Sequence, residues 1–135
     1  MKKLFIILLS APLLFSCSKN LPAPYNPDYN IEGKWMYEGN SLNTMYIFKD
    51  GTRYTYYCVG SNCDSMYNTY EAGDSNAIPE TNLYTFEKDT LTIDLNFGNF
   101  FKQSVSFECN GNVVVFGDSN LYDWHRLNTD LDNCN

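Results

Sequence analysis

The sequence predicts an all-β fold, a single antiparallel up-and-down barrel of about eight short strands. Residues 90–97 alternate without interruption between apolar and polar side chains, which is typical of a strand with one buried face. Tight hairpin dipeptides, among them Asp50-Gly51 and Asn110-Gly111, recur between the apolar runs. Aromatic residues make up 16% of the chain, and no long run has helical spacing. Without crossover helices the strands must pair antiparallel, and closure of the sheet removes its exposed edges.

The expected strands follow one another between residues 31 and 127, with a loop at residues 71–81. In the strand at 52–59, Tyr54, Tyr56 and Cys58 share one face, while Arg53, Thr55 and Tyr57 share the other. In the strand at 90–97, we expect Leu91, Ile93, Leu95 and Phe97 to face the interior. The expected strands are residues 34–38, 44–49, 52–59, a short one at 65–70, 83–87, 90–97, 101–109, 112–116 and 121–127.

The N-terminal segment has the features of an export signal. Lys2 and Lys3 precede an apolar run that is too short to span a bilayer, which needs about 20 residues. Residues 14–17, Leu-Phe-Ser-Cys, resemble the lipobox of bacterial lipoproteins. The resemblance implies that residues 1–16 are removed and that Cys17 carries acyl chains such as palmitate. Such chains anchor a protein stably in a membrane. The alternative is an ordinary signal peptide with a chance cysteine.

Residues 17–30 are expected to form a proline-rich tether outside the fold, and residues 128–135 a C-terminal tail. Bacterial lipoproteins with Ser after the lipidated Cys, as Ser18 here, mostly reach the outer membrane, and residues 18–27 lack the acidic residues of surface-exported relatives. We therefore expect an outer-membrane anchor with the domain facing the periplasm. Loss of Lys2 and Lys3 changes the formal charge from −7 to −9, which disfavours nucleic acid as a partner.

Four cysteines remain in the mature chain besides Cys17. An even number in an exported domain predicts two disulfides, for which three connectivities exist. Cys58 and Cys63 flank a turn-like tip, so a local bridge between them is the simplest choice, and it leaves Cys109 to pair with Cys134. A zinc site is the rival reading, but this spacing with one distant histidine matches no zinc pattern well.

Between residues 31 and 127 the chain resembles the lipocalin-like domains of small bacterial lipoproteins. The matching parts are Gly33-x-Trp35, the Asp50-Gly51-Thr52 hairpin, residues 89–93 and the closing Trp124-His125-Arg126-Leu127. The resemblance implies that Gly33, Trp35 and Arg126 close one end of the barrel, with the arginine lying across the indole ring. A guanidinium on an indole contributes about 0.5–2 kcal/mol.

The resemblance also implies a binding function for the other end of the barrel. An eight-stranded barrel is either filled by side chains or holds one small ligand. We expect a small apolar or amphipathic ligand, with Tyr54, Tyr56, Phe101 and Phe107 as candidate wall residues. The alternative interpretation is that these aromatic side chains belong to the hydrophobic core and bind nothing.

A different class of function is an envelope interaction or inhibitor module with a filled barrel. Its contact surface would combine Tyr56, Tyr57, Tyr67 and Tyr70 with the acidic loop at residues 71–80. The alternative interpretation of that surface is a solvated loop without a binding role.

Catalysis is not expected. His125 is the single histidine, and Asp123 lies two residues before it, a spacing that does not orient an imidazole as catalytic triads do. No fingerprint of a hydrolase, metalloprotease, nucleotide or dinucleotide site occurs. We expect no cofactor and no metal.

Overall fold

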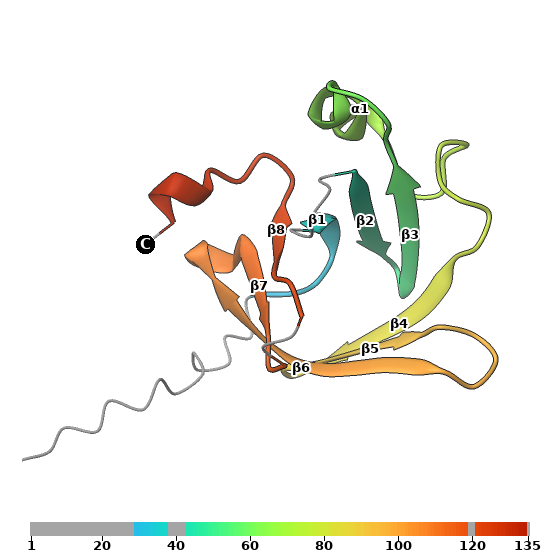
Figure 1. Ribbon diagram of the computed structural model, residues 1–135. Helices are drawn as coiled ribbons and strands as arrows, with labels where there is room; N and C mark the ends of the chain where they lie inside the picture. Colours follow the sequence, from blue (N-terminus) through green and yellow to red (C-terminus); the bar gives the residue numbers. More distant parts are fainter. Residues whose placement is uncertain (1–28, 38–42, 119–120, 135) are drawn as a thin grey trace, which may run out of the picture.

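Eight antiparallel strands close into one barrel in the computed structural model, which describes residues 29–37, 43–118 and 121–134 (Figure 1). The strands pair in sequence order, and the first strand also pairs with the last, which confirms the predicted fold class. They are β1 (Gly33–Tyr37), β2 (Thr44–Lys49), β3 (Thr52–Tyr57), β4 (Asn82–Glu87), β5 (Thr90–Asp94), β6 (Phe100–Glu108), β7 (Val113–Phe116) and β8 (Trp124–Arg126). The other elements are helix α1 (Cys63–Thr69) and two short 3-10 turns, Cys109–Gly111 and Leu131–Asn133.

Closure of the barrel depends on the pairing of β1 with β8. Trp35 lies opposite Arg126, and Tyr37 lies opposite Trp124. The β2–β3 hairpin turns at Asp50 and Gly51, whose φ angles are 49° and 77°. Residues that tolerate positive φ are the ones that a two-residue hairpin requires, so this turn forms where the sequence predicts it.

The interior of the barrel is a single aromatic and aliphatic core. Trp35, Phe48 and Leu91 are almost completely buried there, and β4 and β6–β8 supply the remaining walls. Tyr29 and Asn30, which the sequence assigns to the tether, also contact this part of the fold. The Tyr29 ring lies 5.8 Å from the Phe107 ring, and the Asn30 carbonyl accepts a hydrogen bond from Arg126.

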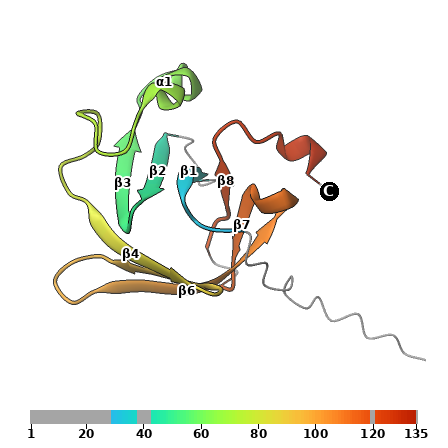
Figure 2. The ribbon, with the colours of Figure 1, turned by 180° about the vertical axis from the view of Figure 1, so that it is seen from behind.

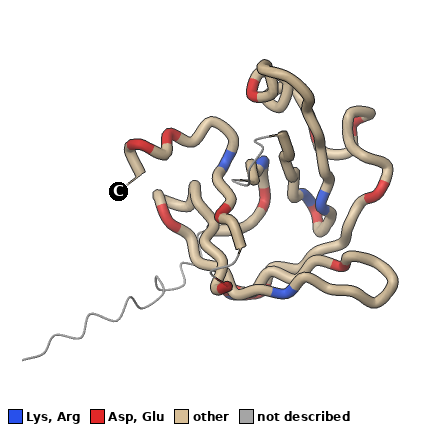
Figure 3. Tube along the Cα trace, viewed as in Figure 1, with Lys and Arg blue, Asp and Glu red and all other residues tan. Residues whose placement is uncertain are grey.

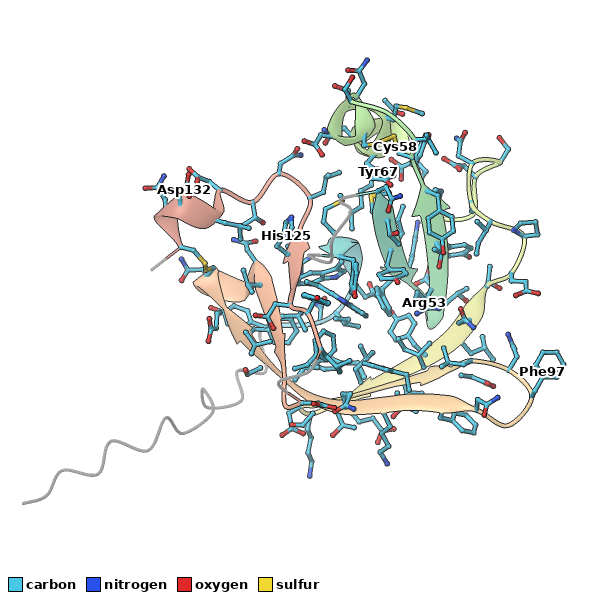
Figure 4. All side chains as sticks on the ribbon, in the orientation of Figure 1. Arg53, Cys58, Tyr67, Phe97, His125 and Asp132 are labelled. Carbon is cyan, nitrogen blue, oxygen red and sulfur yellow. A yellow bond between two sulfur atoms is a disulfide. The ribbon has the colours of Figure 1, made fainter. Side chains whose placement is uncertain are left out.

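The predicted inward row of residues 90–97 is correct only in its first half. Leu91 and Ile93 are buried in the barrel core. β5 then ends at Asp94, whose carboxylate accepts a hydrogen bond from the Asn96 amide and so turns the chain. Asn96 and Phe97 take positive φ angles, and Phe97 projects fully exposed from the hairpin tip (Figure 4). Leu95 is also partly exposed, although it still lines the barrel mouth.

The short strand expected at residues 65–70 is wrong, because the chain forms α1 there. The Cys58–Cys63 disulfide fixes the start of the helix beside the end of β3. Cys63, Tyr67 and Tyr70 recur at helical spacing and form one packed face. Lys34 of β1 donates to the carbonyls of Tyr67 and Asn68, which supplies a cation where the helix dipole favours one. No helix in the described part of the chain is long and apolar enough to span a membrane.

A second core lies between α1 and the outer face of β1–β3. It contains Met36, Met45 and Tyr56, with Tyr67 as the central residue from the helix. Figures 1 and 2 both show α1 beside the ends of β2 and β3, outside the ring of strands. The wall formed by β1–β3 is therefore buried on both faces, whereas β4–β6 expose their outer face.

Candidate functional site

A cavity of about 240 Å³ lies at one end of the barrel, where β1 and β7 finish and β8 begins. The aromatic rings of its wall brace one another: Trp124 lies 4.9 Å from Phe116 and 5.1 Å from Tyr46. Tyr37 and Tyr122 meet edge to face at 5.6 Å beside them. Ring contacts of this geometry favour a fixed arrangement of the wall. The lining residues are Tyr37, Tyr46, Arg53, Ile93, Leu95, Phe101, Phe116, Leu121, Tyr122 and Trp124.

The opposite end of the barrel is closed by the three residues that the resemblance singles out. The Trp35 ring is fully buried and its Nε1 donates to the Ile31 carbonyl at 2.6 Å. The Arg126 guanidinium lies 4.4 Å above this ring and donates to the carbonyls of Gly111 and Glu32. Gly33 has a φ of +123°, and a Cβ there would collide with the Arg126 guanidinium. Only glycine leaves room for this plug.

The four predicted wall residues do not come together. Phe101 lines the cavity, but Phe107 lies at the closed end, 6.2 Å from the Trp35 ring. Tyr54 and Tyr56 belong to the second core on the outer face of β3, so their placement in the barrel interior is a correction. Tyr56 is fully buried on the face of β3 that packs against α1, and its hydroxyl donates to the Glu71 carbonyl at 2.6 Å.

The physical reason for this inversion is that β3 is covered on both faces. Alternation along β3 places the tyrosines on one face of the strand and the polar residues on the other. In a barrel, the face with the more apolar residues ordinarily points into the interior. Here the apolar row packs under α1, and the row of Arg53 and Thr55 turns inward, opposite Phe48 and Tyr46. The contact surface of the alternative interaction module is corrected too, since Tyr67 and Tyr70 are buried.

Arg53 is the functional residue that the sequence analysis does not single out. It lines the cavity, and its guanidinium lies 4.9 Å from the Tyr46 ring centroid. One of its terminal nitrogens donates to the side-chain oxygen of Asn82 on β4, while its Nε is buried without a hydrogen-bond partner. Burial lowers the pKa of Arg53, opposed by Tyr46 and Tyr57, and burial raises the pKa of Tyr46, opposed by Arg53. A polar residue in an inward row is the signal that could have revealed it.

The two predicted disulfides are both present, Cys58–Cys63 and Cys109–Cys134. The first joins α1 to β3, and the second ties the C-terminal segment to the turn between β6 and β7. Cys17 and the leader lie outside the described residues. His125 on β8 pairs with Met36 on β1 and is not among the residues that line the cavity. Among the described residues, no three of the types His, Cys, Asp and Glu gather as a metal-binding group.

Two buried tyrosines predict a stability loss at alkaline pH. Burial raises the pKa of Tyr67 to about 12 and that of Tyr84 to about 12, the latter helped by nearby Glu32. The unfolded chain releases these protons near pH 10, so the folded form binds more protons above that pH. Stability should therefore be independent of these groups below pH 10 and fall between about pH 10 and 12. Phenolate absorbance and circular dichroism recorded together would test this; a single ionisation step near pH 10 with the fold intact would contradict it.

Fold and cavity define a class: a small closed antiparallel barrel, plugged at one end and hollow at the other. Comparisons of the chain with protein-family models, with curated protein sequences and with solved structures each found no match.

Proposed function

We propose that this protein is a lipocalin-like, non-enzymatic binding protein that takes a small apolar or amphipathic molecule into the cavity at the open end. The observation that carries the proposal is the cavity of about 240 Å³ with an aromatic and aliphatic wall. Ligand sites are concave, mostly apolar and supplied with few polar groups, and this lining has the same character.

The size of the cavity limits the ligand. Sites for drug-sized ligands measure roughly 300–1,000 Å³, so a cavity of about 240 Å³ suits a more compact molecule. The braced rings of Trp124, Phe116 and Tyr46 offer a fixed surface for its apolar part. A fixed wall lowers the cost of ordering side chains on binding.

We also propose that the mature chain is anchored in the outer membrane through acyl chains on Cys17 and faces the periplasm. The support is the lipobox at residues 14–17 together with two disulfides, which fit an oxidising compartment. The acidic composition argues against nucleic acid as a partner. Figure 3 shows acidic positions recurring on the turns and on the C-terminal segment, with fewer basic positions.

A matched pair of variants tests whether the cavity binds a ligand. Leu95 lines the cavity mouth, and Leu83 on β4 is exposed outside it. We expect 1-octanol to bind the wild-type protein saturably and to change its tryptophan fluorescence, since Trp124 is part of the wall. Leu95→Trp should weaken this binding by about tenfold or more, because the new ring occupies the mouth. Leu83→Trp should bind like wild type. The proposal fails if wild type shows no saturable binding or if both variants bind alike.

A second candidate is an interaction module, which one surface feature favours. Leu83, Phe97 and Phe100 are exposed to 66%, 101% and 62% on the outer side of β4–β6 and the hairpin tip. Large exposed apolar side chains on one sheet often mark interaction surfaces. In this case the patch, and not the cavity, would carry the function.

A further inference from the structure

One cation lines the cavity among the described lining residues, and it is Arg53 (Figure 4). Every other lining side chain is aromatic or aliphatic, so the guanidinium is the dominant charge that a bound molecule would meet. Arg53 contacts the Tyr46 ring, which in turn contacts Trp124, so the cation adjoins the aromatic wall of the cavity.

The guanidinium is held in place by neighbours on two strands. Asn82 stands opposite Arg53 in the β3–β4 register and accepts a hydrogen bond from it at 2.5 Å. The amide nitrogen of the same Asn82 donates to the Asp94 carbonyl at 2.8 Å, which fixes the orientation of the acceptor. The Tyr46 ring covers one face of the guanidinium at 4.9 Å. Arg53 is therefore positioned before any ligand arrives.

Within the part of the chain that the structure describes, however, no carboxylate forms an ion pair with Arg53. Among residues 29–37, 43–118 and 121–134, the ion pair that forms is Lys34–Glu71, which does not include Arg53. The contacts of Arg53 are a neutral amide and a neutral ring, and its Nε donor is buried without a partner. An unpaired buried donor and a half-buried charge without a counter-ion both cost stability. An anionic ligand group beside the guanidinium would supply the counter-charge that the described residues do not provide.

We infer that the ligand is an amphipathic organic anion, whose carboxylate-type group binds Arg53 while its apolar part lies against the Trp124 and Phe116 rings. The inference rests on the proposed binding function. A guanidinium forms the stronger, charge-assisted hydrogen bonds with carboxylates, and it does so through two parallel donors. Arg53 then determines specificity for charge, and the aromatic wall provides most of the contact area.

Three probes with the same eight-carbon chain separate charge from apolar binding: octanoate, 1-octanol and octylamine. Wild type should bind octanoate about ten- to a hundred-fold more tightly than 1-octanol, because hydrogen bonds to a charged group are the stronger ones. Octylamine should bind most weakly. Arg53→Met should lose the preference for octanoate while keeping its affinity for 1-octanol, and Arg53→Lys should retain part of the preference. Lys102→Met removes an exposed lysine on β6 and should behave as wild type.

The outcomes distinguish this inference from the proposed function. Equal affinity of wild type for octanoate and 1-octanol would overturn the inference and leave the binding function standing. No binding of any probe would overturn both. If Arg53→Met lowered the affinity for octanoate and for 1-octanol by the same factor, Arg53 would be a structural residue of the β3–β4 pair, and the inference would fail. NMR needs no variant: the Arg53 Nε–H resonance should shift on adding octanoate and stay in place with 1-octanol.

Discussion

Trp35→Ala should lower the free energy of unfolding by about 3–5 kcal/mol, the usual cost of truncating a buried tryptophan. The side chain is fully buried, donates to the Ile31 carbonyl and lies under the Arg126 guanidinium. Its removal leaves a cavity at the closed end, and the Arg126 guanidinium loses the ring on which it lies. Since a domain of this size has roughly 5–15 kcal/mol of stability, this loss is a large fraction of the total, and the variant should unfold at a much lower urea concentration than wild type.

Urea unfolding followed by circular dichroism measures this loss. Trp35→Phe is the matched control, because it keeps most of the ring volume and removes the Nε1 hydrogen bond together with part of the cation–π contact. It should cost less, about 1–2 kcal/mol. A loss below about 1 kcal/mol for Trp35→Ala would show that the closed end does not depend on its plug.

The strands could be predicted because local chemistry and the global fold agree along most of the chain. Asp50-Gly51 specifies the β2–β3 hairpin by its tolerance of positive φ. Leu91 and Ile93 alternate with polar residues on a strand whose outer face is left open to solvent, so hydrophobicity alone identifies the inner row. The disulfide pairing follows from cysteine number and from one short turn.

The candidate site was harder to predict, because the wall of β1–β3 has two buried faces. Hydrophobicity then no longer identifies the interior, and the row of Tyr54 and Tyr56 is the more apolar one. The orientation of β3 is determined by α1, which covers the face of Tyr54 and Tyr56, so that Arg53 on the other face points into the barrel. The sequence pattern does not predict the helix itself, because it is only 7 residues long and begins at a disulfide. Isolated helices of this length are unstable in water, so tertiary contacts determine its formation.

Phe97 is predicted to be buried by its place in the alternating pattern, but its side chain is fully exposed. Its apolar side chain continues a regular alternation, yet the preceding Asp94 carboxylate caps a turn and ends the strand. Local side-chain-to-backbone hydrogen bonds compete with the sheet ladder, and at this position the turn prevails.

Tyr67→Ala tests the claim that the second core determines the face of β3, and it should cost about 3–5 kcal/mol. Tyr67 is fully buried, lies 5.9 Å from the Tyr70 ring and donates through its hydroxyl to the Asn43 carbonyl. Without this ring α1 keeps the Cys58–Cys63 link but loses its main packing contact. Amide hydrogen exchange should accelerate over residues 63–78 more than over β5 and β6. Uniform acceleration across the barrel would contradict a separate outer core.

Conservative variants decide whether the two cores act independently. Trp35 and Tyr67 belong to different clusters on opposite faces of the β1–β3 wall. The destabilisation of the double variant Trp35→Phe/Tyr67→Phe should therefore equal the sum of the single effects within about 0.5 kcal/mol. A coupling energy above about 1 kcal/mol would mean that the wall transmits strain between its faces. In that case α1 would influence the cavity directly, because β1–β3 supply Tyr37, Tyr46 and Arg53 to its lining.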